Sequence, residues 1–253
     1  MLNARRRRTG DFSSRPSVPR ATVFLHIPKT GGTSLRQVVV QAYPPGRCKI
    51  MYRHEFEKQA SAGAEIPDGG AVYGHLYFGV HEALGISARY VTVIRHPVDR
   101  VVSFYRQQAR DANSDYFDTI AKGMTIADLL HSGCHQVNNH MVRIISGYKG
   151  DGHVDDWSVL KEAVANLAHF EVVGLTERMN ESVAWLAQRL GWPTCPTVPR
   201  LNVSTNVSTV DDATRAEIRR FNRLDLELYE LVRSQWPLGM SQILPAQQGG
   251  SQT

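Results

Sequence analysis

The sequence has few cysteines and lacks any long run of apolar residues. Its three cysteines, Cys48, Cys134 and Cys195, are an odd number, lie far apart and contain no C-x-x-C pair. This pattern argues against a disulfide framework and is typical of a reducing compartment. No stretch approaches the roughly 18 apolar residues that a membrane-spanning helix needs. We therefore expect neither a disulfide-rich secreted protein nor an integral membrane protein.

Beyond its first twenty residues the chain also lacks an excess of charge of either sign. Lysine and arginine number 29 against 24 aspartates and glutamates, which gives a net charge of +5. Residues 1–20 hold six arginines and one aspartate, so they account for the whole excess. This Arg-, Pro- and Ser-rich composition predicts a disordered tail, and we expect no nucleic-acid partner. No apolar segment follows the arginines, so we expect no export signal and a cytoplasmic location.

Strand-like and helix-like segments alternate along the rest of the 253-residue chain. This alternation predicts a single α/β domain with a mainly parallel sheet and helices on both faces. The domain is expected over 21–238, between tails at 1–20 and 239–253. Strands are predicted from residue 22 onward and at 48–52, 71–73, 89–94 and 170–175. Helices are predicted at 34–43, from Pro97, in two pieces within 125–147, at 156–169 and 180–190, and in two pieces within 211–236.

The most informative stretch, TVFLHIPKTGGTS, begins at residue 22 and runs from a strand through a glycine turn into a helix start. The first N–H groups of a helix lack partners in the helix, and the helix dipole favours an anion beside them. Gly31 and Gly32 let the backbone approach that anion. Thr33 and Ser34 can donate hydroxyls, and Lys29 adds a mobile positive charge. The stretch predicts a cradle for phosphate or a related oxyanion.

The position of the lysine separates two kinds of phosphate loop. In the nucleotide-triphosphatase pattern G-x-x-x-x-G-K-[ST] the lysine follows the last glycine, whereas Lys29 precedes both glycines. The string HIPKTGGTS resembles the 5′-phosphosulfate loop of sulfotransferases that use 3′-phosphoadenosine 5′-phosphosulfate (PAPS), in particular the carbohydrate (heparan sulfate 2-O-sulfotransferase-like) family. This resemblance implies a P-loop-NTPase-like sulfotransferase fold. It assigns cofactor binding to Pro28, Lys29, Thr30, Gly31, Gly32, Thr33 and Ser34.

A second motif, RHPVDRVVSFY at 95–105, resembles the family's 3′-phosphate motif R-[DHN]-P-x-x-R-x-x-S-x-Y. Arg95 follows a predicted strand, and ligands of open α/β sheets bind at the carboxyl ends of strands. Its planar guanidinium suits a phosphate. The resemblance implies that Arg95 and Ser103 bind the 3′-phosphate of PAPS. Arg100 can either contact the ligand or form an ion pair with Asp99 or another neighbour.

Sulfuryl transfer needs a cation at the leaving oxygen and a base that is neutral near pH 7. Lys29, with the loop amides, is predicted to supply the first. Histidine suits the second, and His75 lies in a GHLYF string that resembles the G-H-x-x-[FY] stretch of the 2-O-sulfotransferase catalytic histidine. A structural or substrate-orienting role is the alternative for His75. His26 is predicted to brace the loop, and His81 and His96 are further candidates.

Weaker assignments also rest on the resemblance. The segment 138–147 corresponds to one near the nucleotide and acceptor cleft, which makes Arg143 a candidate for cofactor binding. The segment 202–208 corresponds to a loop near the adenine or 3′-phosphate, so Ser204 and Thr205 are candidates too. The histidines and cysteine within 131–140 have the spacing H-x-x-C-H-x-x-x-x-H, which matches no standard zinc site, and we expect no metal.

The sequence therefore predicts a PAPS-dependent sulfotransferase that acts by in-line transfer and releases adenosine 3′,5′-bisphosphate (PAP). The expected partner is a hydroxyl-bearing acceptor, a saccharide or glycoconjugate, whose binding residues we expect within 47–64 and 111–135. A nucleotide-dependent kinase is one alternative, disfavoured by the position of Lys29 and the lack of a clear acidic strand end for magnesium. A non-catalytic nucleotide- or polyanion-binding protein is the other, disfavoured by Lys29, His75 and Ser103 together.

Overall fold

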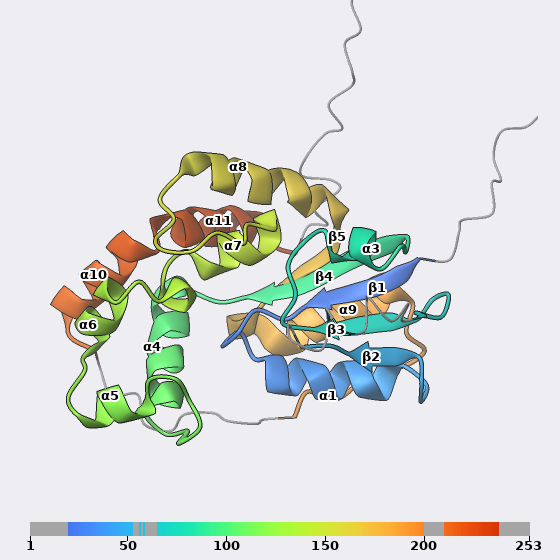
Figure 1. Ribbon diagram of the computed structural model, residues 1–253. Coiled ribbons are helices and arrows are strands. Elements are labelled where there is room, and N and C mark those ends of the chain that lie inside the picture. Colours follow the sequence, from blue (N-terminus) through green and yellow to red (C-terminus); the bar gives the residue numbers. More distant parts are fainter. Residues whose placement is uncertain (1–19, 53–55, 57, 59–64, 200–209, 238–253) are drawn as a thin grey trace, which may run out of the picture.

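The computed structural model describes residues 20–52, 56, 58, 65–199 and 210–237 of the chain. Within these ranges a five-stranded sheet lies between two layers of helices (Figure 1). Every strand pairing is parallel. The strands in spatial order are β2 (Cys48–Ile50), β3 (Ala71–Gly74), β1 (Ala21–Leu25), β4 (Ala88–Ile94) and β5 (Phe170–Leu175). The prediction of an α/β fold with a parallel sheet is confirmed.

The central strands are buried along most of their length because helices cover both faces of the sheet. All five residues of β1 are buried, as are the last five of β4. Strands of this kind read as continuous apolar runs, which is why the sequence located β1, β3, β4 and β5. The strand order is also informative, because the chain visits β2 and β3 on one side of β1 before it crosses to β4 and β5 on the other.

Two apolar clusters hold the helical layers against the sheet. On one face, Phe24 and Val91 pack with Leu35 and Leu186, which belong to α1 (Gly32–Ala42) and α9 (Met179–Leu190). On the other face, apolar residues of the same strands pack against three helices (Figure 1). These are α7 (His140–Ser146), α8 (Trp157–Asn166) and α11 (Arg223–Gln235).

A third cluster lies beyond the edge toward which the strands run (Figure 1). Its helices are α4 (Pro97–Gln108), α6 (Ile126–His131) and α10 (Asp212–Phe221), and the short α5 (Phe117–Ala121), which has no buried residue, lies beside them. Val101 of α4, Leu130 of α6 and Ile218 of α10 are fully buried in it. Because α4 leaves directly from β4, this cluster holds α4 next to the carboxyl ends of the strands.

Short elements account for most differences from the sequence expectation. The helices α3 (Val80–Ala83) and α5 were not predicted, because four or five residues are too few for a helical period. The 3-10 helices are η1 (His135–Val137), η2 (Leu167–His169) and η3 (Thr176–Arg178). The predicted tails lie outside the described residues, apart from Arg20. No described helix is long and apolar enough to cross a membrane.

Candidate active site

The carboxyl ends of parallel strands meet at one edge of the sheet, and predicted site residues follow three of those ends, with Thr176 after a fourth. The 28–34 loop follows β1, His75 follows β3, Arg95 follows β4 and Thr176 follows β5. Ligands of open α/β sheets bind at this edge, where the strand order reverses. The structure thus brings together residues that are up to about 150 positions apart in the chain.

Hydrogen bonds tie the loop to its neighbours at this edge. Arg95 Nη1 donates to the carbonyl of Lys29 at 3.1 Å. The Thr176 hydroxyl lies 3.0 Å from the carbonyls of both Thr30 and Ile94. The two segments predicted to bind the phosphates of the cofactor are therefore in direct contact. Thr176 was missed by the sequence prediction, since no local pattern marks it.

The backbone of the loop turns through two left-handed residues before α1 begins. Gly31, the N-cap of α1, has φ of 81°, and Lys29 has φ of 73°, which few residues other than glycine adopt. Thr30 is buried, and its hydroxyl donates to the carbonyl of Ile27 at 2.9 Å. The first amides of α1 have no acceptor within the helix, so they remain able to bind an anion.

Gly32 is the tightest point of the loop. A Cβ atom added there would lie 1.6 Å from Nε2 of His26, and the Tyr73 hydroxyl donates to the Gly32 carbonyl at 2.7 Å. The His26 ring lies with its centroid 5.4 Å from that of Tyr73. Burial, helped by the charges of His75 and Lys29, lowers the pKa of His26 to about 3. His26 is thus a neutral, packed side chain that allows only glycine at position 32.

The ammonium group of Lys29 has a neutral hydrogen-bond partner. Its Nζ donates to Oε1 of Gln107, on α4, at 2.9 Å. Burial lowers the pKa of Lys29, and the charges of Arg110 and Arg95 lower it further. An amide holds the ammonium without cancelling its charge, so the charge stays available to an anion. Gln107 was not predicted, and it lies one helical turn after Ser103, which places both on the same face of α4.

Arg100 lies one turn before Ser103, and its side chain is fully buried. Its Nη2 donates to the carbonyl of Gln136 at 2.7 Å, and it does not pair with Asp99 in the described part of the chain. Its Nε and Nη1 have no hydrogen-bond partner among the described residues. Burial lowers the pKa of Arg100, although the charge of Asp225 opposes this.

His75 is half-buried at the end of β3. Its ring lies 4.5 Å from the ring of His26 and 5.1 Å from that of Tyr52, between centroids. Burial lowers the pKa of His75, so the imidazole is neutral at pH 7. The ring also lines a cavity of about 310 Å³ on the α7 side of the sheet. A neutral imidazole beside a cavity and close to the 28–34 loop can accept a proton.

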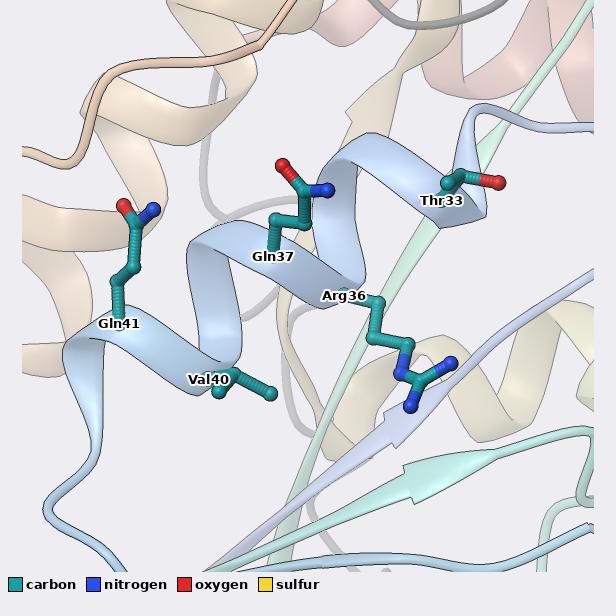
Figure 2. A pocket seen from close by; sticks show the side chains of 5 residues that line it. All are labelled: Thr33, Arg36, Gln37, Val40 and Gln41. Atoms are coloured by element: carbon teal, nitrogen blue, oxygen red, sulfur yellow. The ribbon is translucent and has the colours of Figure 1, made fainter.

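A second cavity, of about 360 Å³, runs along α1 from the end of the loop. Figure 2 shows the five side chains that line it, with Arg36 and Val40 leaving the helix on one side and Gln37 and Gln41 on another. Thr33, the fifth, belongs to the loop. At the same end of the helix, the Ser34 hydroxyl donates to the carbonyl of Pro199 at 2.9 Å.

Arg143 is buried, and the chain itself occupies its donors. Its Nε donates to the carbonyl of Asn138 at 3.1 Å, and Nη1 donates to that of Gly150 at 2.7 Å. Its Nη2 donates to Oδ1 of Asn138 and to the carbonyl of Gly152. These contacts give Arg143 a structural role. Its assignment to the cofactor stays a prediction, and Ser204 and Thr205 lie outside the described residues.

The residues next to Arg143 join two helix starts to each other. Asn139 Oδ1 accepts hydrogen bonds from the amides of Leu224 and Asp225, at 3.0 and 3.1 Å, at the start of α11. In return, the Asp225 carboxylate accepts from the amides of Met141 and Val142, at 3.1 and 2.8 Å, at the start of α7. Asn139 Nδ2 also donates to the carbonyl of Val154 at 2.7 Å. We call Asn138, Asn139, Arg143, Asn222 and Asp225 the interior network.

The remaining histidine candidates lie in separate surroundings. His81 Nδ1 lies 2.7 Å from the Tyr90 hydroxyl. His96 caps α4, and its amide donates to Glu177 Oε1 at 2.8 Å. His131 pairs with Glu217 at 2.8 Å. In the described part of the chain, no group of three or more His, Cys, Asp or Glu side chains is arranged to hold a metal ion.

The chain was compared with known proteins in three ways. A family model described as "Sulfotransferase family" matches residues 20–232. Among solved structures, the chain is similar to the crystal structure of mouse sulfotransferase SULT7A1 complexed with PAP, with 16% sequence identity and a TM-score of 0.41. The match covers 83% of this chain and 66% of that one, so the chain spans just under two thirds of its length. A comparison with curated proteins gives no match.

Proposed function

The chain belongs to the sulfotransferase family, and on that premise we propose that it transfers the sulfuryl group of PAPS to a hydroxyl group of a carbohydrate. The observation that carries the proposal is the hydrogen bond from Arg95 to the Lys29 carbonyl. It joins the two segments whose sequences resemble the phosphosulfate and 3′-phosphate motifs. A single ligand with two anionic groups can therefore reach both segments.

The loop residues fit such a ligand. His26 packs against Gly32 where a side chain would project, so the close packing of the loop requires glycine there. The first amides of α1 and the Lys29 ammonium converge on the same turn, where the helix dipole adds to their attraction. Arg95 and Ser103, at the end of β4 and on α4, are the proposed donors to the 3′-phosphate.

PAPS supplies a sulfuryl group activated by its bond to the 5′-phosphate. During transfer the bond from sulfur to the phosphate oxygen breaks, and a bond from sulfur to the acceptor oxygen forms. Lys29 and the loop amides stabilise the negative charge that develops on the phosphate oxygen. His75 takes the proton of the acceptor hydroxyl, because burial keeps its imidazole neutral. PAP and the sulfated acceptor are the products.

Thermal stabilisation tests the cofactor. PAP at about 100 times its dissociation constant should stabilise the protein by roughly 2.7 kcal/mol, whereas ATP with magnesium should not. Arg95→Met should lose most of this stabilisation. Arg89→Met is the matched control, because Arg89 lies near the start of the same strand and bonds to Thr22. Stabilisation by ATP with magnesium but not by PAP would contradict the proposal.

A substitution of His75 tests the proposed base. His75→Ala should keep PAP binding and lower turnover by about 10²–10⁴-fold, the usual contribution of general base catalysis. The measurement is transfer from radiolabelled PAPS to a hydroxyl acceptor under saturating PAPS. His81→Ala is the control, since the His81 side chain contacts Tyr90 and does not line the cavity. If His75→Ala kept near-wild-type turnover, another group would be the base.

A further inference from the structure

The cavity beside His75 is enclosed by segments that are distant in the sequence. Its lining comes from residues 75–80, Glu82 and Ala83, from Phe56, and from Gly147 and Lys149 after α7. Of these, only Phe56 falls within the ranges where the sequence predicted acceptor-binding residues. Apart from His75, the lining residues after β3 were not assigned to the acceptor, because the short α3 gives no sequence signal.

The wall of this cavity is rigid before any ligand binds. The amide of Phe78 donates to the carbonyl of Ile144 at 2.9 Å, which fixes this segment to α7. The Phe78 ring lies 4.8 Å from the Tyr90 ring and 6.1 Å from the Phe170 ring, between centroids. At the end of α7, a Cβ added to Gly147 would lie 2.9 Å from the Phe78 carbonyl. Pre-formed cavities of this kind are typical of small-molecule sites.

Size restricts what the cavity can hold. Its volume of about 310 Å³ is at the lower end of the roughly 300–1,000 Å³ found for small-molecule sites. A single ring with its substituents fits such a volume, whereas several linked sugar residues do not. The cavity is therefore suited to one terminal ring.

The chemistry of the lining restricts the occupant further. Leu76, Tyr77 and Phe78 give an apolar and aromatic surface, which suits the CH groups on one face of a pyranose. The charged lining residues are Glu82 and Lys149, which are exposed and opposite in sign. Their charges offset each other, so the cavity offers no net attraction to an anion.

We propose that this cavity is the acceptor pocket, and that it takes one uncharged sugar ring with a hydroxyl directed at His75. The inference rests on the proposed function and narrows its acceptor from any carbohydrate to a neutral terminal ring. Glu82 is a specificity-determining residue in this pocket, because its carboxylate offsets the attraction of Lys149 for acidic sugars. The cavity along α1, which contains Arg36, is the rival acceptor site.

Two matched substitutions test which of the two cavities binds the acceptor. Ala83 is exposed and lines the pocket beside His75, so Ala83→Trp fills that pocket. Val40 is 49% exposed and lines the cavity along α1, so Val40→Trp fills the other. The probes are phenyl glucoside and phenyl glucuronide, which carry a hydroxymethyl group and a carboxylate, respectively, on C5 of the sugar ring, with radiolabelled PAPS as donor. Thermal stabilisation by PAP is measured on each variant in parallel.

The expected result has three parts. The wild type sulfates the glucoside with a kcat/KM at least tenfold above that for the glucuronide. Ala83→Trp lowers kcat/KM for the glucoside at least tenfold with unchanged stabilisation by PAP, whereas Val40→Trp changes neither. Glu82→Gln raises transfer to the glucuronide at least twofold.

Three outcomes would overturn the inference. They are a loss of transfer in Val40→Trp but not in Ala83→Trp, a preference for the glucuronide, and no transfer to either glycoside by a protein that PAP stabilises. In each of these the proposed sulfotransferase function would survive. If PAP failed to stabilise the wild type, that function would itself fail.

Discussion

Lys29 in the loop after β1 and Arg143 in α7 are both cations withdrawn from solvent, and their partners differ. The Lys29 ammonium contacts one neutral amide, that of Gln107. The Arg143 guanidinium donates to three backbone carbonyls and to the Asn138 side chain. Sequence resemblance assigned both residues to the cofactor. Their surroundings favour ligand binding for the first and a structural role for the second.

The difference shows how hydrogen bonds can separate binding residues from structural ones. A buried polar group is costly unless it is paired, so a structural cation uses its donors within the chain. A ligand-binding cation must instead keep donors and charge available until the ligand arrives. The loop also contains a non-glycine residue at positive φ, Lys29, and such conformations are common at functional sites.

The largest expected effect is on stability, in the interior network. Asn139→Ala removes the partners of the Leu224 and Asp225 amides and of the Val154 carbonyl. Each orphaned buried group costs about 1–3 kcal/mol, so we expect a loss of about 4 kcal/mol. Urea unfolding measures it, with the exposed Asn113→Ala as control. A change below 1 kcal/mol would mean that the network does not hold α7 against α11.

A substitution of Lys29, in the loop, should affect turnover more than stability, unlike Asn139→Ala. Lys29→Met keeps the length of the side chain but removes its charge, so turnover should fall by about 10²–10³-fold. The free energy of unfolding should fall by at most about 1.5–3 kcal/mol, less than for Asn139→Ala, because only one charge-assisted hydrogen bond, that to Gln107, is lost. Steady-state kinetics and urea unfolding on the same preparation measure both. Comparable turnover in the variant and the wild type would remove Lys29 from the mechanism.

The pH dependence of stability tests the packing of His26. Its folded pKa of about 3 lies below the unfolded value of 6.5, so the unfolded chain binds more protons between these values. The contribution of His26 is therefore complete above pH 6.5 and is lost as the pH falls toward 3. His26 adds at most about 1.4 kcal/mol per pH unit to the slope of the free energy of unfolding against pH. His26→Gln should flatten the stability curve between pH 6.5 and 5, and an unchanged slope would contradict the buried, neutral state.

The smallest expected effect concerns Ser103. If its hydroxyl donates to the 3′-phosphate, Ser103→Ala should weaken PAP binding by about fivefold to tenfold, the value of one such hydrogen bond. Isothermal titration measures the affinity, with the exposed Ser158→Ala as control. Equal affinities for PAP in the two variants would show that Ser103 only contributes to the surface of α4.

The sequence was most informative where a local pattern was sufficient. Continuous apolar runs located the strands, and Pro97 marked the start of α4. The 28–34 loop and Arg95 were found by motif, and the structure brings them into contact. Gln107 and Thr176 were missed because they contact the loop across 78 and 146 positions of the chain. No local pattern records such a separation.

The same limit applies to residues with two plausible roles. Arg143 has the residue type and context of a phosphate-binding arginine, and only its contacts with Asn138, Gly150 and Gly152 identify its structural role. Helical spacing could not show that the Arg100 side chain is buried or that it does not pair with Asp99. Burial and partner choice depend on tertiary packing, which single-sequence patterns do not contain.

The mutual capping of α7 and α11 has a consequence for synthesis of the chain on the ribosome. Asn139 and Asp225 cap each other's helices across more than eighty positions, so the first amides of α7 lack their carboxylate acceptor until Asp225 has left the ribosome. Chains that stop short of α11 leave this set of buried amides unpaired. The layer of α7, α8 and α11 should therefore fold late, after the β1–α1 unit, and as one cooperative body.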